Sequence, residues 1–263
     1  MEFEVGDLVT RISYGHDVVF KITAIEDNNI KLKGISVRLY ADSNADDLVF
    51  CSKEIEEITK DDDSFKDSVR DLINLDRSQY FYLPGRILHI DGDEDYLEKC
   101  LKFYREANVL VYGIHEDEEE MSINIKKYLT DINPDILVIT GHDAYYKKNG
   151  KKDDIKSYKN TDKFIKTVIE ARKYEKAYDK LIIIAGACQS NYEALLKSGA
   201  NFASSPKRVN IHALDPAIIA LTLSLTDKSK DIDLIDVLKK TKYGESGIGG
   251  IITKGTMYVG YPR

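Results

Sequence analysis

Hydrophobic residues along the chain follow two different rhythms, and the change between them divides the sequence. In residues 1 to about 52, apolar residues form short runs that are separated by turn residues. These runs predict strands at 5–9, 18–25, 30–33, 37–40 and 48–50. Short strands at this spacing predict a small SH3-like β-barrel, which is usually an interaction or packing module.

The pattern changes over residues 53–83. Acidic residues are frequent as far as Asp63, and then Phe65, Val69, Leu72 and Ile73 recur at helical spacing. We interpret this segment as a linker that carries one amphipathic helix.

From residue 84 onward, continuous aliphatic runs alternate with amphipathic patterns. The aliphatic runs predict strands at 86–90, 109–114, 135–140 and 181–185. The patterns between them predict helices at 96–104, 121–129 and 162–178. Such an alternation predicts an α/β fold, in which helices cover both faces of a parallel sheet. Further elements are expected at 200–205, 216–225, 234–239 and 248–259, so 84–263 forms one α/β domain.

Composition narrows the class of protein. The formal net charge of −7 and the lack of a broad basic stripe argue against nucleic acid as a partner. The N-terminus has no secretory pattern, and no segment approaches the roughly 18 apolar residues of a membrane span. Three cysteines at irregular spacing make neither a disulfide framework nor a zinc site. We therefore expect a cytoplasmic protein with free thiols, and neither a cofactor nor a metal is indicated.

Three of the predicted strands end in residues that can do chemistry. Ligands of an open parallel sheet gather beyond the carboxyl ends of its strands. Asp91-Gly92-Asp93 follows the first strand, Gly141-His142-Asp143 the third, and Gly186-Ala187-Cys188 the fourth. If the third and fourth strands are neighbours, with backbones about 4.8 Å apart, His142 and Cys188 flank one gap that a peptide carbonyl can enter.

Cys188 and His142 together predict a cysteine endopeptidase. A thiol near a helix N-terminus and an imidazolium is favoured as the nucleophilic thiolate, and His142 can then protonate the leaving amine. Backbone N–H groups, including that of Cys188, can form an oxyanion hole, and Gly141 and Gly186 permit close approach of the backbone. The structural alternative for each residue alone is an inert buried thiol and a histidine that closes a loop. The remaining cysteines, Cys51 and Cys100, are expected to be structural.

The order of the two residues resembles that of clan CD peptidases, which include caspases, gingipains, clostripain and legumain. His142 precedes Cys188 by 46 positions (188 − 142), and each follows a hydrophobic strand. The clan resemblance implies a caspase-hemoglobinase-like fold for the α/β peptidase domain, residues 84–263. Longer motifs lie along the whole chain: VGD at 5–7, LYADS at 39–43, LPG at 83–85, LHIDGD at 88–93, ITGHDAY at 139–145, AGACQS at 185–190 and GANFASSP at 199–206. These motifs resemble those of the YabG family of sporulation-specific proteases.

This resemblance implies a thiol protease that is made in sporulating bacteria. It implies protein substrates among spore coat proteins, cortex-associated proteins or germination-protease precursors, and cleavage chiefly after Arg. It also implies a location in the mother-cell cytoplasm, with association to the spore coat.

The chain departs from the wider clan at two positions. Caspases and gingipains have Gly directly after the catalytic His, whereas here Gly141 precedes His142 and Asp143 follows it. Several clan members with basic specificity have Asp two positions before the nucleophile, where this chain has Gly186.

The carboxylate that pairs with a substrate arginine must therefore come from elsewhere, because an unpaired buried arginine is too costly. Asp215 and Asp143 are the first candidates, and Asp91 and Asp93 are less favoured candidates for the same role. A second interpretation of Asp215, favoured slightly, is that of an N-cap before a proline at the first helical position.

Three further residues are candidates for substrate binding. Residues 201–206 are expected to lie beside the fourth strand, and in clan CD enzymes the corresponding segment pairs with substrate backbone as an added strand. On this basis Ser204 and Ser205, with Gln189, contact substrate. The equally weighted alternative is that these serines only end a strand.

Two other classes of protein were weighed. The acidic opening after the first strand resembles a receiver module, but a receiver needs an Asp at the end of the third strand, where Thr140 and Gly141 stand. A non-catalytic spore coat scaffold is the second alternative. For the peptidase, Arg70 and Arg77 in the polar linker are expected sites of self-cleavage.

Overall fold

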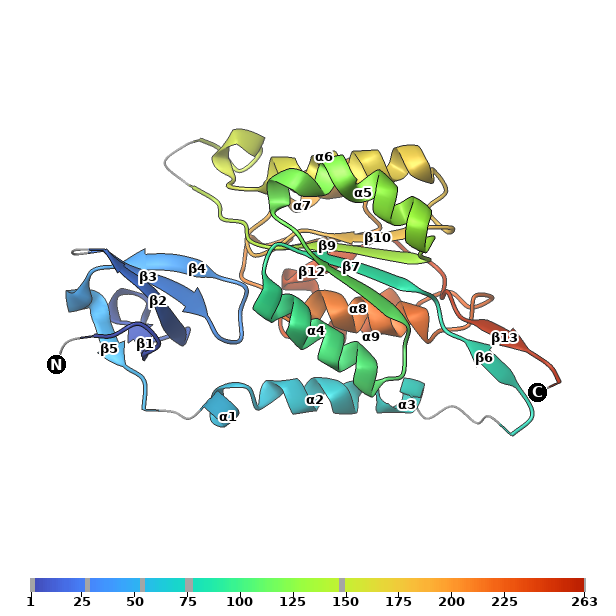
Figure 1. Cartoon of the computed structure of the whole chain (residues 1–263), viewed down its shortest axis with the longest axis horizontal. Helices are drawn as coiled ribbons and strands as arrows, with labels where there is room; N and C mark the ends of the chain where they lie inside the picture. The colour runs from blue at the N-terminus through green and yellow to red at the C-terminus, as the bar shows by residue number, and fades with distance from the viewer. Residues whose placement is uncertain (1–2, 27–28, 53–54, 74–77, 147–149, 263) are drawn as a thin grey trace. The chain divides into compact units, whose positions relative to one another are not determined.

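A computed structural model describes residues 3–26, 29–52, 55–73, 78–146 and 150–262. The chain separates into two compact units, Met1–Ser64 and Phe65–Arg263. Figure 1 traces both units from the N-terminus to the C-terminus. The two units are described separately below.

The N-terminal unit is an antiparallel sheet around its own apolar core. Its strands are β1 (Leu8–Arg11), β2 (Phe20–Glu26), β3 (Asn29–Gly34), β4 (Tyr40–Ser43) and β5 (Leu48–Phe50), in the order β4-β3-β2-β1-β5. Alternate residues point inward, as a half-buried strand requires, so Phe20 and Ile22 are completely buried. Strand β4 lies three residues further along than the sequence pattern predicts.

The segment between the antiparallel sheet and β6 differs from the prediction of one helix. Its described residues form three short helices, α1 (Ile55–Ile58), α2 (Asp61–Ser68) and α3 (Arg70–Ile73). Phe65 and Val69 are buried in the core of the α/β unit, so the apolar spacing did identify the packing face. The chain then forms β6 (Phe81–Leu83), which pairs with β13 (Tyr258–Gly260).

A six-stranded mixed sheet forms the centre of the α/β unit. The strands are β7 (Ile87–Asp91), β8 (Val111–His115), β9 (Ile136–Thr140), β10 (Ile182–Ala185), β11 (Phe202–Ser204) and β12 (Ile248–Gly250). Their order is β12-β11-β10-β9-β7-β8, and only the pairing of β12 with β11 is antiparallel among these described strands. Strands β7, β9 and β10 are buried along their whole length, because helices cover both of their faces.

Helices form one layer on each face of this sheet (Figure 1). One layer contains α5 (Glu118–Ile132), α6 (Thr161–Tyr174) and α7 (Tyr192–Ser198). The other contains α4 (Glu94–Glu106), α8 (Asp215–Ser224) and α9 (Leu234–Lys239). Each layer buries its own apolar cluster against the sheet. The predicted α/β class is therefore confirmed.

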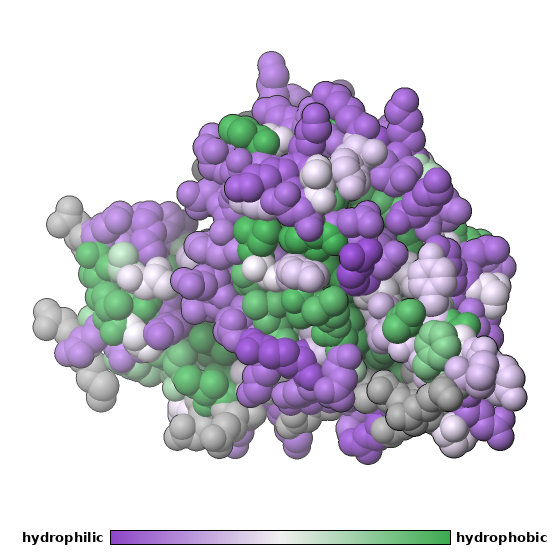
Figure 2. All heavy atoms as spheres, turned by 45° about the vertical axis from the view of Figure 1, so that its right-hand side comes forward, coloured by the Kyte–Doolittle hydropathy of each residue, from purple (hydrophilic) through white to green (hydrophobic). Residues whose placement is uncertain are grey.

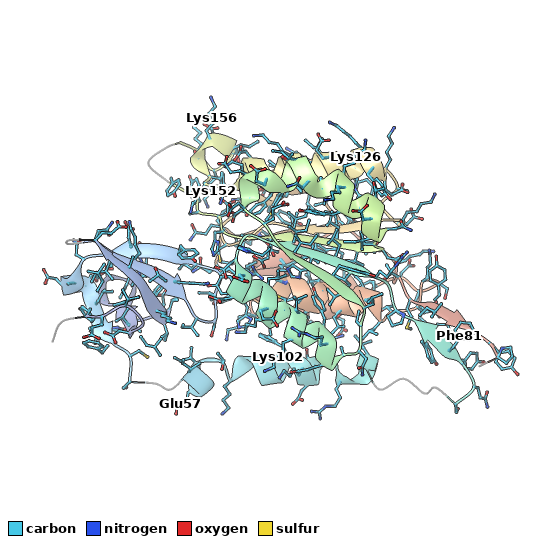
Figure 3. The ribbon with its side chains drawn as sticks, viewed as in Figure 1. Glu57, Phe81, Lys102, Lys126, Lys152 and Lys156 are labelled. Carbon is cyan, nitrogen blue, oxygen red and sulfur yellow. The ribbon has the colours of Figure 1, made fainter. Side chains whose placement is uncertain are left out.

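The outer surfaces of α4 and α5 carry charged side chains, whereas α8 is buried along its whole length. Lys102 on α4 and Lys126 on α5 point away from the sheet in Figure 3. Figure 2 shows hydrophilic side chains over much of the displayed face of the α/β unit, with smaller apolar areas between them. Among the described helices, none has the length and apolar character needed to cross a membrane.

Candidate active site

His142 and Cys188 leave neighbouring strands at the same edge of the sheet. Strands β9 and β10 pair in parallel, with Val138 opposite Ile184 and Ile139 opposite Ala185. His142 follows the last residue of β9 by two positions (142 − 140), and Cys188 follows that of β10 by three (188 − 185). The predicted adjacency of these strands is confirmed, while the catalytic roles of the two residues stay a prediction.

The imidazole of His142 lies between two carboxylates. The His142 backbone N–H donates a hydrogen bond of 2.8 Å to Glu118 Oε1, and the same oxygen is 3.7 Å from His142 Nδ1. Asp93 Oδ2 is 3.4 Å from Nε2, and the Tyr96 ring packs against the imidazole at 5.8 Å between centroids. These contacts hold the ring in one position, as acid–base catalysis requires.

Glu118 reaches His142 across two glycines. A Cβ atom at Gly92 or at Gly141 would lie 2.4 Å from Glu118 Oε1, so either side chain would displace this carboxylate. Burial opposes ionisation of Glu118, but its hydrogen bonds with His142 outweigh that effect and hold its pKa below the ordinary value. Glu118 was not among the site residues predicted from the sequence, because nothing in its own neighbourhood distinguishes it from the adjacent glutamates.

Cys188 is completely buried. Its Sγ accepts a hydrogen bond from the Ile211 N–H at 3.2 Å and lies 3.8 Å from the Ile211 carbonyl oxygen. The thiol does not face the open gap that the sequence predicts between the two strand ends, so this prediction is wrong for the conformation described. The physical reason is that a later part of the chain folds over the sulfur.

Residues 205–211 form this cover, and we call them the covering segment. Its contacts run along the backbone beside the thiol: Gln189 N–H donates to the Val209 carbonyl at 3.1 Å, and Gln189 Nε2 donates to Asn210 Oδ1 at 3.2 Å. Gln189, Ser205 and Arg208 all have positive φ, at 60°, 67° and 57°. A non-glycine residue in this region costs about 1–2 kcal/mol, so surrounding contacts must hold the turn in place.

Asp143 is fully engaged in holding the site together. Its carboxylate accepts hydrogen bonds from Ala144 N–H, Asn160 N–H, Ser190 Oγ and Thr161 Oγ1. Burial raises the pKa of Asp143 above its ordinary value, and these hydrogen bonds offset only part of that effect. The carboxylate links the ends of β9 and β10 to α6, which argues against its use for a substrate arginine.

Asp215 is occupied in a similar way. It is the first residue of α8, which has Leu214 as its N-cap, and so it is not itself the cap that the sequence favoured. Its carboxylate accepts the His212 N–H and the Lys242 N–H, both at 2.8 Å. Asp215 therefore braces two loops against the start of α8.

Asp91 and Asp93 are the less favoured candidates for pairing with a substrate arginine. Asp91 is completely buried and accepts a hydrogen bond from Thr140 Oγ1 at 2.8 Å. Asp93 caps α4 by accepting the Tyr96 N–H, and its second oxygen faces His142. Asp93 thus belongs to the surroundings of the imidazole.

Ser204 and Ser205 lie beside β10, as predicted, but they offer no open strand edge. β11 pairs with β10 on one side, and on the other side Ser204 pairs with Ile248 of β12. The Ser205 N–H also donates to the Gly247 carbonyl at 2.6 Å. An added substrate strand along residues 202–205 is therefore contradicted in this conformation, because β12 and the residue before it occupy that edge.

Gly186 supports the turn before the nucleophile candidate. Its φ is +107°, and a Cβ atom there would lie 2.8 Å from Leu195 Cδ1 and 3.2 Å from Ser204 Cβ. Only glycine fits this turn without strain. Cys100 is buried in α4, in agreement with a structural role, and Cys51 is partly buried after β5.

Comparison with known proteins defines the class of this protein. The family model described as YabG peptidase U57 matches residues 4–262. The sporulation-specific protease YabG of Bacillus subtilis (strain 168) is 44% identical over 286 residues, which cover 100% of this chain and 99% of that protein. No solved structure matches the chain. The protein is a peptidase. It belongs to the YabG family of peptidases.

Proposed function

We propose that this peptidase is a cysteine endopeptidase of sporulation in which Cys188 is the nucleophile and His142 its acid–base partner. The observation that carries the proposal is the placement of these two residues directly beyond adjacent parallel strands, β9 and β10. Glu118 and Asp93, on either side of the imidazole, support an acid–base role for His142.

The proposed reaction has two steps. The Cys188 thiolate attacks the scissile carbonyl carbon, the C–N bond breaks, and the leaving amine takes a proton from His142. Water then attacks the resulting thioester, gives a proton to His142, and releases the acid and the thiolate. Backbone N–H groups near Gly141, Asp143 and Gly186 are the proposed donors to the oxyanion.

The domain organisation is also part of the proposal. We propose a caspase-like α/β domain over residues 84–263, an SH3-like barrel over 1–52 and a linker between them. The His-then-Cys order and the helical layers on both sheet faces support the first assignment. The antiparallel sheet β4-β3-β2-β1-β5 supports the second.

The proposed substrates are proteins of the spore coat and cortex or germination proteins, cut after arginine in the mother cell. The Bacillus subtilis relative is named as a sporulation-specific protease, and this supports the setting. Gln189 remains a proposed neighbour of substrate, but only after the covering segment has moved.

Self-cleavage in the linker is proposed as well. Arg70 is exposed at the start of α3, and Arg77 lies outside the described residues. After long incubation, wild-type protein is expected to show a new fragment on a gel, whereas Cys188→Ala stays intact. Identical gels for the two proteins would remove this part of the proposal.

Digestion of a peptide library tests the proposed function. Wild type is expected to cut after Arg, Cys188→Ala to cut nothing, and the control Cys51→Ala to behave as wild type. Undiminished cleavage by Cys188→Ala would exclude the thiol mechanism. Binding of the library without cleavage by wild type would favour a non-catalytic scaffold.

A further inference from the structure

Arg208 in the covering segment has an environment that is unusual for a loop arginine. Its side chain is only 8% exposed, and it forms an ion pair with Glu193 at the start of α7. Its Nε donates a 2.7 Å hydrogen bond to Tyr158 Oη. Two of its remaining donor contacts go to backbone carbonyls of the covering segment itself, those of Ser205 and Pro206.

The groups that hold the guanidinium form a subsite of their own. Tyr158 is 5% exposed, and its hydroxyl also donates to the Lys152 carbonyl at 2.7 Å. Asn191 caps α7 through Ala194 N–H, and its side-chain amide donates to the same Lys152 carbonyl at 3.1 Å. Lys152 and Lys156, labelled in Figure 3, mark the loop before α6 that supplies Tyr158. The Glu193 carboxylate and the Asn191 amide oxygen, from the start of α7, and the Tyr158 phenol, from the loop before α6, thus converge on one guanidinium.

A short series of contacts connects this subsite to the thiol. Gln189, the residue after Cys188, accepts the Tyr145 N–H at 3.2 Å. The Tyr145 ring packs against the Tyr158 ring at 5.2 Å between centroids. The arginine that occupies the subsite and Ile211, which contacts Sγ, belong to one covering segment. The segment therefore runs across the nucleophile with its arginine side chain bound close by.

We propose that Glu193 and Tyr158 form the subsite that binds the substrate arginine at the cut, and that Arg208 occupies it until substrate replaces the covering segment. This inference rests on the proposed function and supplies the carboxylate that arginine specificity requires. Asp143 and Asp215 already accept hydrogen bonds with both of their oxygens. Glu193, whose side chain is 56% exposed, needs only to exchange one guanidinium for another.

Cleavage of three matched peptides that differ only at the residue before the cut tests the subsite. The residues are arginine, its neutral isostere citrulline, and lysine. Glu193→Gln is expected to lower kcat/KM for the arginine peptide by roughly 30-fold and for the citrulline peptide by less than about 3-fold, because only the first carries the charge. Arg208→Ala is expected to lower KM for the arginine peptide roughly 10-fold with little change in kcat.

Glu98→Gln is the matched control, because Glu98 forms an Arg–Glu pair with Arg105 on the outer face of α4. If Glu193→Gln leaves the ratio of kcat/KM for the arginine peptide to that for the citrulline peptide unchanged, the proposal is overturned. A rise in kcat/KM for both peptides would overturn it too, since the Glu193–Arg208 pair would then only hold the covering segment closed.

A binding measurement separates this proposal from the proposed function. Cys188→Ala is titrated by calorimetry with a peptide that ends in arginine, and the same is done for the double variant with Glu193→Gln. Binding that is weakened at least 10-fold in the double variant supports the subsite, whether or not Cys188 is the nucleophile. Equal affinities would overturn it, even if the thiol mechanism holds.

Discussion

The ends of β9 and β10 stand side by side, yet they present very different surroundings to the reaction. At the end of β9, His142 is held by charged groups, with Asp93 and Glu118 on its two sides. At the end of β10, Cys188 is completely buried, and its sulfur accepts a backbone N–H from the covering segment. The surroundings of the proposed acid–base residue are therefore assembled, whereas the proposed nucleophile is closed off from solvent.

Under the proposed mechanism, this difference places the control of activity at the thiol. A thiol that accepts a hydrogen bond and has no access to solvent cannot meet a peptide carbonyl, however well the imidazole is placed. The opening that we propose is a movement of residues 205–211, because β10 and α7 contribute buried residues to the apolar core. The following predictions test the two strand ends separately.

Removal of the imidazole is expected to have the largest effect. His142→Ala should lower kcat for an arginine peptide about 1000-fold, since general acid–base catalysis is worth 10²–10⁴. His115→Ala, at the exposed end of β8, is the control and should retain full activity. Steady-state kinetics on both variants measure the effect, and a loss of less than about 10-fold would remove His142 from the mechanism.

The second largest effect is expected from removal of the Asp143 carboxylate, which links the ends of β9 and β10. Asp143→Ala leaves the donors of Ser190, Thr161 and Asn160 unsatisfied, and should lower the free energy of unfolding by about 3 kcal/mol. Asp162→Ala on the outer side of α6 should change it by less than about 0.5 kcal/mol. Urea denaturation provides both values. Equal stability of the two variants would show that Asp143 does not hold the strand ends.

A weaker effect is expected from loosening the covering segment. Asn210→Ala removes the hydrogen bond to the Gln189 side chain. Because one hydrogen bond contributes about 1 kcal/mol net, the covering segment should open about 5-fold more often, and iodoacetamide should label Cys188 about 5-fold faster. Labelling of Cys100 in the same protein is the internal control and should stay unchanged. Mass spectrometry of peptides gives both rates, and a parallel rise at both cysteines would indicate general unfolding.

The smallest expected effect concerns acid stability. The pKa of Glu118 is lowered in the folded state, so its contribution to stability is present above its ordinary value of 4.5 and is lost as the pH falls below it. Glu118→Gln lacks this contribution. Its free energy of unfolding should therefore change less between pH 7 and pH 3.5 than that of wild type. Parallel curves for the two proteins would contradict the hydrogen bonds assigned between Glu118 and His142.

Gly92→Ala provides a second test of the contribution of Glu118 to acid stability. The added Cβ atom would lie 2.4 Å from Glu118 Oε1, at the end of a flexible side chain that can move away. We expect the fold to persist while the flattened acid dependence of Glu118→Gln reappears. Wild-type acid dependence in Gly92→Ala would mean that the carboxylate keeps its place beside His142.

The fold and the two strand ends could be predicted because their signals are local. Leu181 to Ala185 is aliphatic throughout, and such a run is typical of a strand that is buried on both faces. Parallel strands place their carboxyl ends at one edge, so the sequence predicts that His142 and Cys188 follow strands at the same edge of the sheet. The SH3-like and caspase-like assignments and the domain limits stay predictions.

The surroundings of these residues could not be predicted, because they come from distant parts of the chain. Glu118 reaches His142 only because β8 lies beside β7, which lies beside β9. Nothing in the sequence of residues 205–211 distinguishes a cover for Cys188 from an ordinary loop. The role of Asp215 could not be predicted for the same reason, since the Lys242 N–H that it accepts lies 27 residues away along the chain.

Covalent trapping with an arginine-terminated peptidyl acyloxymethyl ketone tests the central claim most directly. A thiolate that acts as the nucleophile displaces the acyloxy group and leaves a thioether, which intact-mass and peptide analysis locate. The account predicts one adduct, at Cys188, that is absent in Cys188→Ala and formed far more slowly in His142→Ala. An adduct at Cys51 or Cys100, or none on active wild-type enzyme, would contradict it.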